Sequence, residues 1–390
     1  MFFAHPVFVV AELKPLDDAD MSNVVGQAYI SIDKHFNPDI NDSTSYTRIN
    51  FGMDVDIQAN IETLELGRYE RVGAASDSFG EKKESDILIH NMGLGFIYDS
   101  DYYARNKDAA RPLKDDGSYY TNGEIVPFEI TDPFFEFAFD EATNEISGMR
   151  MGFGKAKGVL SGVIETLTGN VNIDIKDSGQ GMRAASSTGT VGDQLVVLLT
   201  PLLEGSSPLV TKAQLVDSLG NLDPVRATKI GVPDGAAFNL SGASGFTRWS
   251  LKNLLGWSLS SDIEIPNCSF FSCPSGDIYI YVNDCEVLGV QACFNLSNYN
   301  SFPIGKIQEV GGKRYLTDST EGMFLSFQTK DLDWLKDVKK SSPTDADFIR
   351  ATAGAFFNVP NGAVTVNLSE AINGVEGVRR EYIDRGNGLF

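Results

Sequence analysis

The stretch "FGMDVDIQANIETLELG", residues 51–67, decides the fold class because its apolar and polar side chains alternate. Counting from Ile49, the apolar residues fall on every odd position as far as Ile61. A period of two is typical of a β-strand with one buried and one solvated side. The sequence therefore predicts one strand over residues 49–61, longer than the usual strand of about 5–6 residues. It also predicts a twist point at Gly52 and a bulge or strand end after Thr63, where the apolar phase changes.

Much of the remaining chain repeats this alternation in shorter pieces. Strands are predicted over residues 28–33, 85–99, 277–282, 321–329 and 362–369, and two further strands within residues 158–175. Residues 134–154 are typical of a hairpin whose turn is "DEATNE" and whose arms place Phe135, Phe137 and Phe139 opposite Met149, Met151 and Phe153. We therefore predict a mainly β fold of long twisted antiparallel strands in a sandwich or prism-like stack, with a few short helices. A β-helix is the alternative.

A few segments have helical character instead. Residues 16–27 combine an aspartate cap, an apolar face and a glycine stop, which predicts a short helix. The middle of the chain is the most compatible with helices, over residues 193–205, 211–222 and 247–259. Residues 345–358 are interpreted as a helix between two strands.

Composition shifts suggest how the chain is divided. Residues 1–11 are interpreted as the remnant of a signal peptide or as a first strand, because they are apolar but lack a basic start. Residues 12–175 are predicted to form an N-terminal β domain. The glycine-rich residues 176–192 are predicted to be a flexible connection. Residues 193–390 then form a mixed, mainly β region that contains a disulfide-pinned segment over residues 268–293.

The four cysteines fall within that segment, at Cys268, Cys273, Cys285 and Cys293. An even number in a tight cluster favours two disulfides, and the short spacings favour Cys268–Cys273 and Cys285–Cys293. Reduced thiols and a zinc site are the alternatives, although C-x4-C and C-x7-C are poor spacings for zinc.

Charge limits the partners of the protein. The 390 residues include 53 acidic and 32 basic ones, for a net charge of -21. Such a chain is a poor match for nucleic acid or for an anionic membrane surface, and no apolar run approaches the about 20 residues of a transmembrane helix. No cofactor is predicted. A structural calcium ion is an open alternative at the acidic runs Asp17, Asp18 and Asp20; Asp54 and Asp56; Asp99 and Asp101; Asp331 and Asp333.

Catalytic motifs are not found, and no catalytic residue is predicted. Histidine occurs only at His5, His35 and His90, and His90 is interpreted as an exposed strand residue. Glu136 and Asp140 are the acids considered for a carboxylate hydrolase, which needs a pair of carboxyl groups. Glu136 lies in a strand of alternating pattern, so we expect it to face solvent.

Phenylalanine is the remaining signal, with 25 in the chain. The run "FFEFAF" places Phe134, Phe135, Phe137 and Phe139 on both faces of one strand. A strand buried on both sides explains this pattern. The functional interpretation is an apolar groove or a contact face for another protein.

Two segments point to a family. "LDDADMSNVVGQAYISID" (16–33) resembles the L-D-D-x-x-M-S-x-V-T-G-Q segment of uncharacterised secreted proteins from marine gammaproteobacteria and pseudomonads, with Val25 in place of the usual threonine. The stretch "PFFEFAFDEATNEISGMRMGFGKAKGVLSG" (133–162) is similar to their central region. The family has no established activity, so the resemblance assigns no catalytic residue. It implies export from a Gram-negative cell.

The expected function is that of a non-enzymatic structural protein, adhesin-like or fibre-forming. It would be exported to the cell surface or the medium, with the periplasm as the alternative. Its expected partner is another copy or another surface protein. The first alternative is a protein that binds an apolar ligand in a phenylalanine-lined cleft, and the second is the carboxylate hydrolase.

Overall fold

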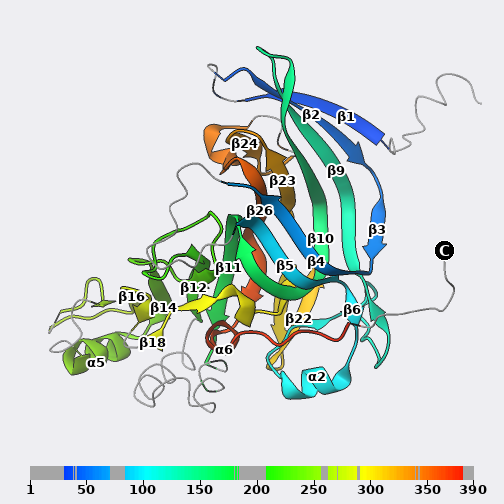
Figure 1. Ribbon diagram of the computed structural model, residues 1–390. Helices are drawn as coiled ribbons and strands as arrows, with labels where there is room; N and C mark the ends of the chain where they lie inside the picture. Colours follow the sequence, from blue (N-terminus) through cyan, green and yellow to red (C-terminus); the bar gives the residue numbers. More distant parts are fainter. Residues whose placement is uncertain are drawn as a thin grey trace, which may run out of the picture.

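A computed structural model describes residues 30–380, apart from 38, 40–41, 71–83, 180, 182, 184–207, 256–261, 270, 288–289, 339 and 341–342. The fold is mainly β, as predicted, with long antiparallel strands in a sandwich-like arrangement. Long strands curve along one side of the molecule, and shorter strands with helix α5 lie at the other (Figure 1). The helical segments described are α2 (Ser100–Arg105), α5 (Gly245–Leu255) and α6 (Leu368–Asn373), with 3-10 turns at Leu296–Asn298 and Asp345–Asp347.

The strands of the first half of the chain include most of the long ones. They are β1 (Ile30–Phe36), β2 (Thr44–Phe51), β3 (Asp54–Ile57), β4 (Ala59–Arg68), β5 (Ser85–Leu94), β6 (Phe96–Ile97), β7 (Arg111–Pro112), β8 (Ile125–Val126), β9 (Phe128–Asp140), β10 (Glu145–Leu167) and β11 (Gly169–Asp177).

The second half contains shorter strands, and one long strand near its end. They are β12 (Leu209–Val216), β13 (Lys229–Gly231), β14 (Ala237–Ala243), β15 (Ile263–Glu264), β16 (Gly276–Tyr281), β17 (Glu286–Val287), β18 (Val290–Gln291), β19 (Cys293–Asn295), β20 (Ser301–Ile304), β21 (Lys306–Val310), β22 (Lys313–Asp318), β23 (Phe324–Gln328), β24 (Leu332–Leu335), β25 (Phe348–Ala351) and β26 (Gly354–Val366).

The hairpin of β9 and β10 pairs with strands from both halves of the chain. The predicted hairpin is present, and its register pairs Phe137 with Met149 and Phe135 with Met151, but Phe153 lies opposite Pro133 and not opposite a phenylalanine. Strand β10 has 23 residues, and it changes partner along its length. Its first part pairs with β9 and β23, and its second part pairs with β5 and β20. One strand thus joins four others, from both halves of the chain.

The opening stretch is not one strand, and that prediction is wrong. It is divided into the end of β2, then β3, then β4. Between β2 and β3 the register moves from Asn50 opposite Phe134 to Asp54 opposite Thr131, so one extra residue bulges out around the predicted twist point, Gly52. After β3 the chain leaves β9 and pairs with β5 instead. The register within β4 is unbroken through Thr63, so the bulge predicted there is absent.

Two predicted helices are strands in the structure. Residues 211–222 begin within β12, whose odd positions Leu209, Ala213 and Leu215 are buried. Residues 345–358 form a 3-10 turn followed by β25 and the start of β26. In both segments the residues gain strand partners outside the segment, and that pairing overrides the local preference for helix. The helix predicted at 247–259 corresponds to α5. The predicted helices at 16–27 and 193–205 lie outside the described residues.

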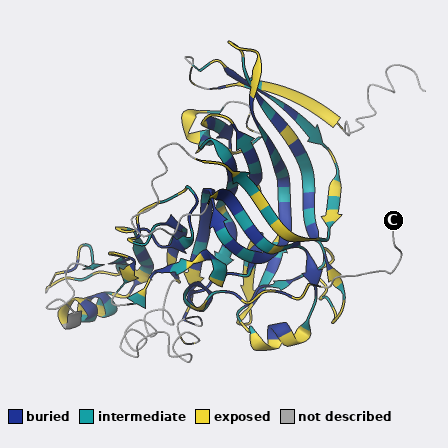
Figure 2. Cartoon of the chain, in the orientation of Figure 1, coloured by how far each residue is buried: buried dark blue, intermediate teal, exposed yellow. Residues whose placement is uncertain are grey.

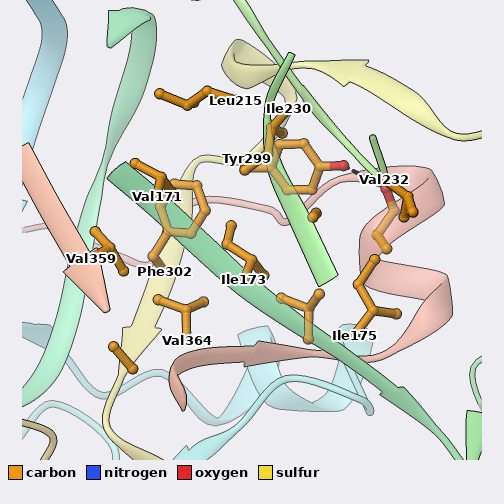
Figure 3. Packing of buried hydrophobic residues seen from close by; sticks show 14 of the residues in the cluster. Val171, Ile173, Ile175, Leu215, Ile230, Val232, Tyr299, Phe302, Val359 and Val364 are labelled. Carbon is orange, nitrogen blue, oxygen red and sulfur yellow. Dashed lines mark hydrogen bonds between the residues drawn. The ribbon is translucent and has the colours of Figure 1, made fainter. Parts of the chain in front are cut away.

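Strands from both predicted regions meet in one sheet. Strand β10 pairs with β23, and β11 pairs with β26 in parallel. The main core lies where these strands meet β12, β13 and β20, and it includes Ile173, Ile230 and Val364 (Figure 3). Figure 2 shows that burial concentrates along β5, β10 and β11, whereas β1 is almost wholly exposed.

Both favoured disulfides are present. The Cys268–Cys273 and Cys285–Cys293 bonds close sequence separations of 5 and 8 residues. No cysteine is free. These bonds close small loops in a region that has only short strands.

Candidate functional site

A row of alternating charges crosses four neighbouring strands. Asp33 on β1 lies opposite Arg48 on β2, which lies opposite Glu136 on β9, which lies opposite Arg150 on β10. Residues directly opposite each other in antiparallel strands point to the same face of the sheet. The local alternation of each strand therefore places all four side chains on one face, in the order acid, base, acid, base.

Glu136 is at the centre of this row and is fully buried, so the prediction that it faces solvent is wrong. Its Oε2 accepts a hydrogen bond from Nε of Arg150 at 2.5 Å. Its Oε1 lies 3.6 Å from Nη1 of Arg48 and 3.7 Å from Nδ1 of His35. A carboxylate can be buried at this depth because two guanidinium groups flank it.

The segment of β24 and β25 covers this face of the sheet and explains the burial. Nη1 of Arg150 donates to the carbonyl oxygen of Leu335 at 2.9 Å, and Nη2 of Arg48 donates to that of Val338 at 2.8 Å. The side chain of Trp334 is fully buried beneath Arg150. The two arginines thus hold the covering segment against the sheet through charge-assisted hydrogen bonds.

Aromatic rings enclose the guanidinium of Arg150 on several sides. Its central carbon lies 4.9 Å from the ring centroid of Phe324, 5.0 Å from that of Trp334 and 5.2 Å from that of Phe134. Ring faces attract cations at such distances. Burial lowers the pKa of Arg150, against the opposing effect of Glu136, but an arginine remains protonated at any physiological pH. Arg150 is therefore a fixed positive charge.

Gly152 makes room for one of these rings. It lies directly opposite Phe134, and a methyl group on Gly152 would come 2.1 Å from the Cζ atom of that ring. The ring of Phe134 occupies the space that a side chain would fill. This close approach lets Phe134 lie under both Arg150 and Arg48.

His35 completes the cluster on the side of β1. Its ring stacks on Tyr46 with centroids 4.8 Å apart. Burial lowers the pKa of His35, and the nearby arginines add to that effect while Glu136 opposes it. His35 is therefore neutral at pH 7, and it adds no positive charge to the cluster.

Six buried polar atoms of this cluster have no hydrogen-bond partner within the described residues. They are Nε2 of His35, the hydroxyl of Tyr46, Nε and Nη1 of Arg48, Oε1 of Glu136 and Nη2 of Arg150. Buried polar groups in folded proteins almost always have a partner, and each exception calls for an explanation. The cluster can therefore offer donors and acceptors to water or to a ligand.

A cavity of about 510 Å³ lies next to the cluster, and Arg150 forms part of its wall. The covering segment contributes Lys336, Asp337, Val338, Phe348, Ile349 and Arg350, and the sheet contributes Phe134, Phe153, Phe324 and Asn358. Glu321, Met323, Asn170, Asn172 and Asn361 complete most of the wall. Four phenylalanines and Arg150, whose side chain is buried, therefore line a single space.

Carboxamides form one polar part of this wall, beside its charged side chains. Asn170 on β11 lies beside Asn358 on the parallel strand β26 and donates to it at 2.8 Å. Asn172 donates to Asn170 at 3.0 Å and accepts from Gln214 at 3.0 Å. Because these amides bond to one another in a ladder, their positions are fixed before any ligand arrives.

The four predicted phenylalanines separate onto the two faces of β9. Phe134 is buried and lines the cavity. Phe135, Phe137 and Phe139 point to the opposite face, where Phe135 is 37% exposed. On that face an apolar row crosses six strands in register, through Ile32, Ile49, Phe135, Met151, Leu325 and Phe357.

Several of the other acids considered from the sequence have local partners. A hydrogen bond from Lys330 lowers the pKa of Asp140 to about 2, so this group is a poor proton donor at neutral pH. Asp99 caps α2, and Asp333 pairs with Arg350 at 2.8 Å. In the part of the chain that the structure describes, no group of three or more histidines, cysteines or acids is placed to hold a metal ion. The run at Asp17, Asp18 and Asp20 lies outside it.

Sequence reasoning did not find Arg48, Arg150, Trp334 or the asparagine ladder. Both arginines stand at polar positions of alternating strands, where a charged residue normally indicates solvent. The pattern shows which side chains share a face of the sheet. It does not show that the segment of β24 and β25 covers that face. The only available signal was the clustering of phenylalanines at Phe134.

Comparison with known proteins gives one partial match. Residues 1–91 match the model of a family of unknown function, DUF6160. Its described part includes β1 to β4 and therefore His35, Tyr46 and Arg48. No curated protein and no solved structure matches the chain. Within the described ranges, no helix is both long and apolar enough to span a membrane.

Proposed function

We propose that this is an exported binding protein that holds an apolar ligand in the cavity beneath β24 and β25. The phenylalanine-lined cavity of about 510 Å³ is the observation that carries the proposal. Ligand sites in proteins are mostly apolar spaces of about 300–1,000 Å³ with a few fixed polar groups. The two disulfides and the acidic surface are compatible with export.

The test is the binding of an uncharged fluorescent probe, N-phenyl-1-naphthylamine, whose emission rises in apolar surroundings. Val338 lines the cavity, so Val338→Trp should fill part of it and weaken probe binding at least about tenfold. The matched control is Val310→Trp, because Val310 is 56% exposed and lies outside the cavity. Equal binding by both variants would place the probe elsewhere and contradict the proposal.

A second candidate is the surface or fibre-forming subunit, which the apolar face of β9 favours. Ile32 is 68% exposed and Ile30 is 51% exposed on β1. Among the described residues β1 pairs only with β2, so its other edge is open to a further strand. Electron microscopy and sedimentation of the wild type should then show assemblies that Ile32→Lys disrupts. Monodisperse single copies at all concentrations would exclude this candidate.

A further inference from the structure

We propose that the ligand of this cavity carries an anionic oxygen group, and that Arg150 is the residue that binds it. The inference rests on the proposed function, because it names the chemical class of the ligand in the same site. It describes how the polar end of the ligand is bound, whereas the proposed function describes how the phenylalanines hold its apolar body.

The first argument is the unused donor of Arg150. Nε donates to Glu136 and Nη1 donates to the carbonyl of Leu335, but Nη2 has no partner within the described residues. The side chain is fully buried and belongs to the cavity wall. An unpaired donor of a buried charged group costs more than that of a neutral one, so this site calls for an acceptor.

The second argument is the fixed position of the guanidinium. Phe134, Phe324 and Trp334 enclose it, and the ion pair with Glu136 fixes its plane. A ligand that reaches Arg150 therefore does not have to order a long flexible side chain. Such pre-organisation removes part of the entropic cost of binding.

The third argument is charge. In the buried part of the row, one carboxylate, Glu136, serves two guanidinium groups, and Asp33 lies at the exposed end beside Arg48. Arg150 thus has one carboxylate partner in the row, whereas Arg48 has two. In the cavity wall Lys336 and Arg350 are balanced by Glu321 and Asp337, and Arg350 also pairs with Asp333, so Arg150 is the buried cation of the wall. A charged acceptor suits the unpaired donor of Arg150, because a charge-assisted hydrogen bond is roughly twice as strong as a neutral one.

A carboxylate and a phosphate monoester share this chemistry. Both present oxygens in the geometry that a guanidinium group recognises. The experiment therefore compares three unbranched molecules of ten carbon atoms each: decanoate, decyl phosphate and decanol. Calorimetric titration or displacement of the neutral probe gives the three dissociation constants at neutral pH and moderate salt.

The expected result is that decanoate or decyl phosphate binds at least about tenfold more tightly than decanol, which corresponds to about 1.4 kcal/mol. The tighter of the two anions identifies the head group. Equal binding of all three molecules would overturn the inference and leave the proposed function standing. If none of them displaces the probe, and the probe itself does not bind, both fail.

Variants assign the effect to Arg150. The double variant Arg150→Met with Glu136→Gln avoids leaving a buried carboxylate without its partner. It should lose the preference for the anion while it binds decanol as the wild type does, and retained decanol binding shows that the cavity is intact. Arg350→Met is the matched control, because this arginine lies at the cavity but its side chain is 59% exposed. If Arg350→Met removes the preference and the double variant keeps it, the assignment to Arg150 is wrong.

Discussion

At the scale of single residues, the burial of Glu136 is the main finding. A carboxylate with no exposed surface is stable here because Arg150 and Arg48 lie on either side of it. Removing one member of such a set leaves charges that neither water nor another side chain neutralises. The same three side chains therefore stabilise the sheet, and one of them, Arg150, also belongs to the cavity wall.

This balance predicts a large effect of Glu136→Leu. The substitution leaves two buried arginines without their carboxylate, so we expect the free energy of unfolding to fall by about 3–5 kcal/mol. Chemical denaturation measures it. Glu145→Gln on the same hairpin is the matched control, because Glu145 is exposed and its substitution should change stability by less than about 0.5 kcal/mol. Similar losses in both variants would show that the ion pairs contribute nothing specific.

His35 gives the cluster a dependence on pH. Its pKa in the folded protein lies below the ordinary value of 6.5, mainly because it is buried. Folding therefore favours the neutral form, and the stabilisation is present above about pH 6.5 and decreases as the pH falls below that value. We expect the melting temperature of the wild type to fall more steeply on acidification from about pH 7.5 to about pH 5.5 than that of His35→Phe, which keeps a ring against Tyr46. Parallel curves would contradict this.

At the scale of elements, the hairpin of β9 and β10 determines which residues can meet. Its register places Glu136 opposite Arg150 and Phe134 opposite Gly152, so one face of the hairpin carries both the charge and the aromatic ring. The other face carries Phe135 and Phe137. A shift of one residue in this pairing would exchange the two faces and separate the ion pair from the cavity.

Strand β3 tests the alternation in the opening stretch. Val55 is half-buried against the main core, whereas Asp56 is exposed. We expect Val55→Asp to lower the free energy of unfolding by about 1–3 kcal/mol, because it places a charge against apolar neighbours. Asp56→Val should keep the melting temperature within a few degrees. Thermal unfolding measures both, and equal tolerance would mean that the two faces of β3 do not differ.

At the scale of the whole molecule, pairing between distant segments holds the fold together. Strand β10 joins β9 and β5 to β23 and β20, and β11 joins β26. The covering segment of β24 and β25 is attached to this sheet through Arg48 and Arg150. The cavity exists only when these parts are assembled, because its wall is drawn from β9, β10, β11, β23, β26 and the covering segment.

The disulfides act on a different part of the molecule. Both lie in the region of short strands, and neither contributes to the cavity wall. Each closes a short loop, so we expect reduction of each bond to lower the free energy of unfolding by roughly 2–3 kcal/mol. Probe binding by the folded, reduced protein should not change. A loss of binding while the far-ultraviolet circular dichroism stays native would show that the disulfides also support the cavity.

What the sequence determined by itself is local. The alternation of side chains identified the mainly β fold and the hairpin at 134–154, because a period of two is a property of each strand alone. The spacing of the cysteines is also a local property, and it favoured the two disulfide pairs. Tertiary structure alone decided that residues 49–61 divide among β2, β3 and β4, and that residues 345–358 form strands. It also decided the burial of Glu136, because a polar position in a strand faces solvent until another segment covers it. Here that segment lies nearly 200 residues further along the chain, where Trp334, Leu335 and Val338 meet the row of charges.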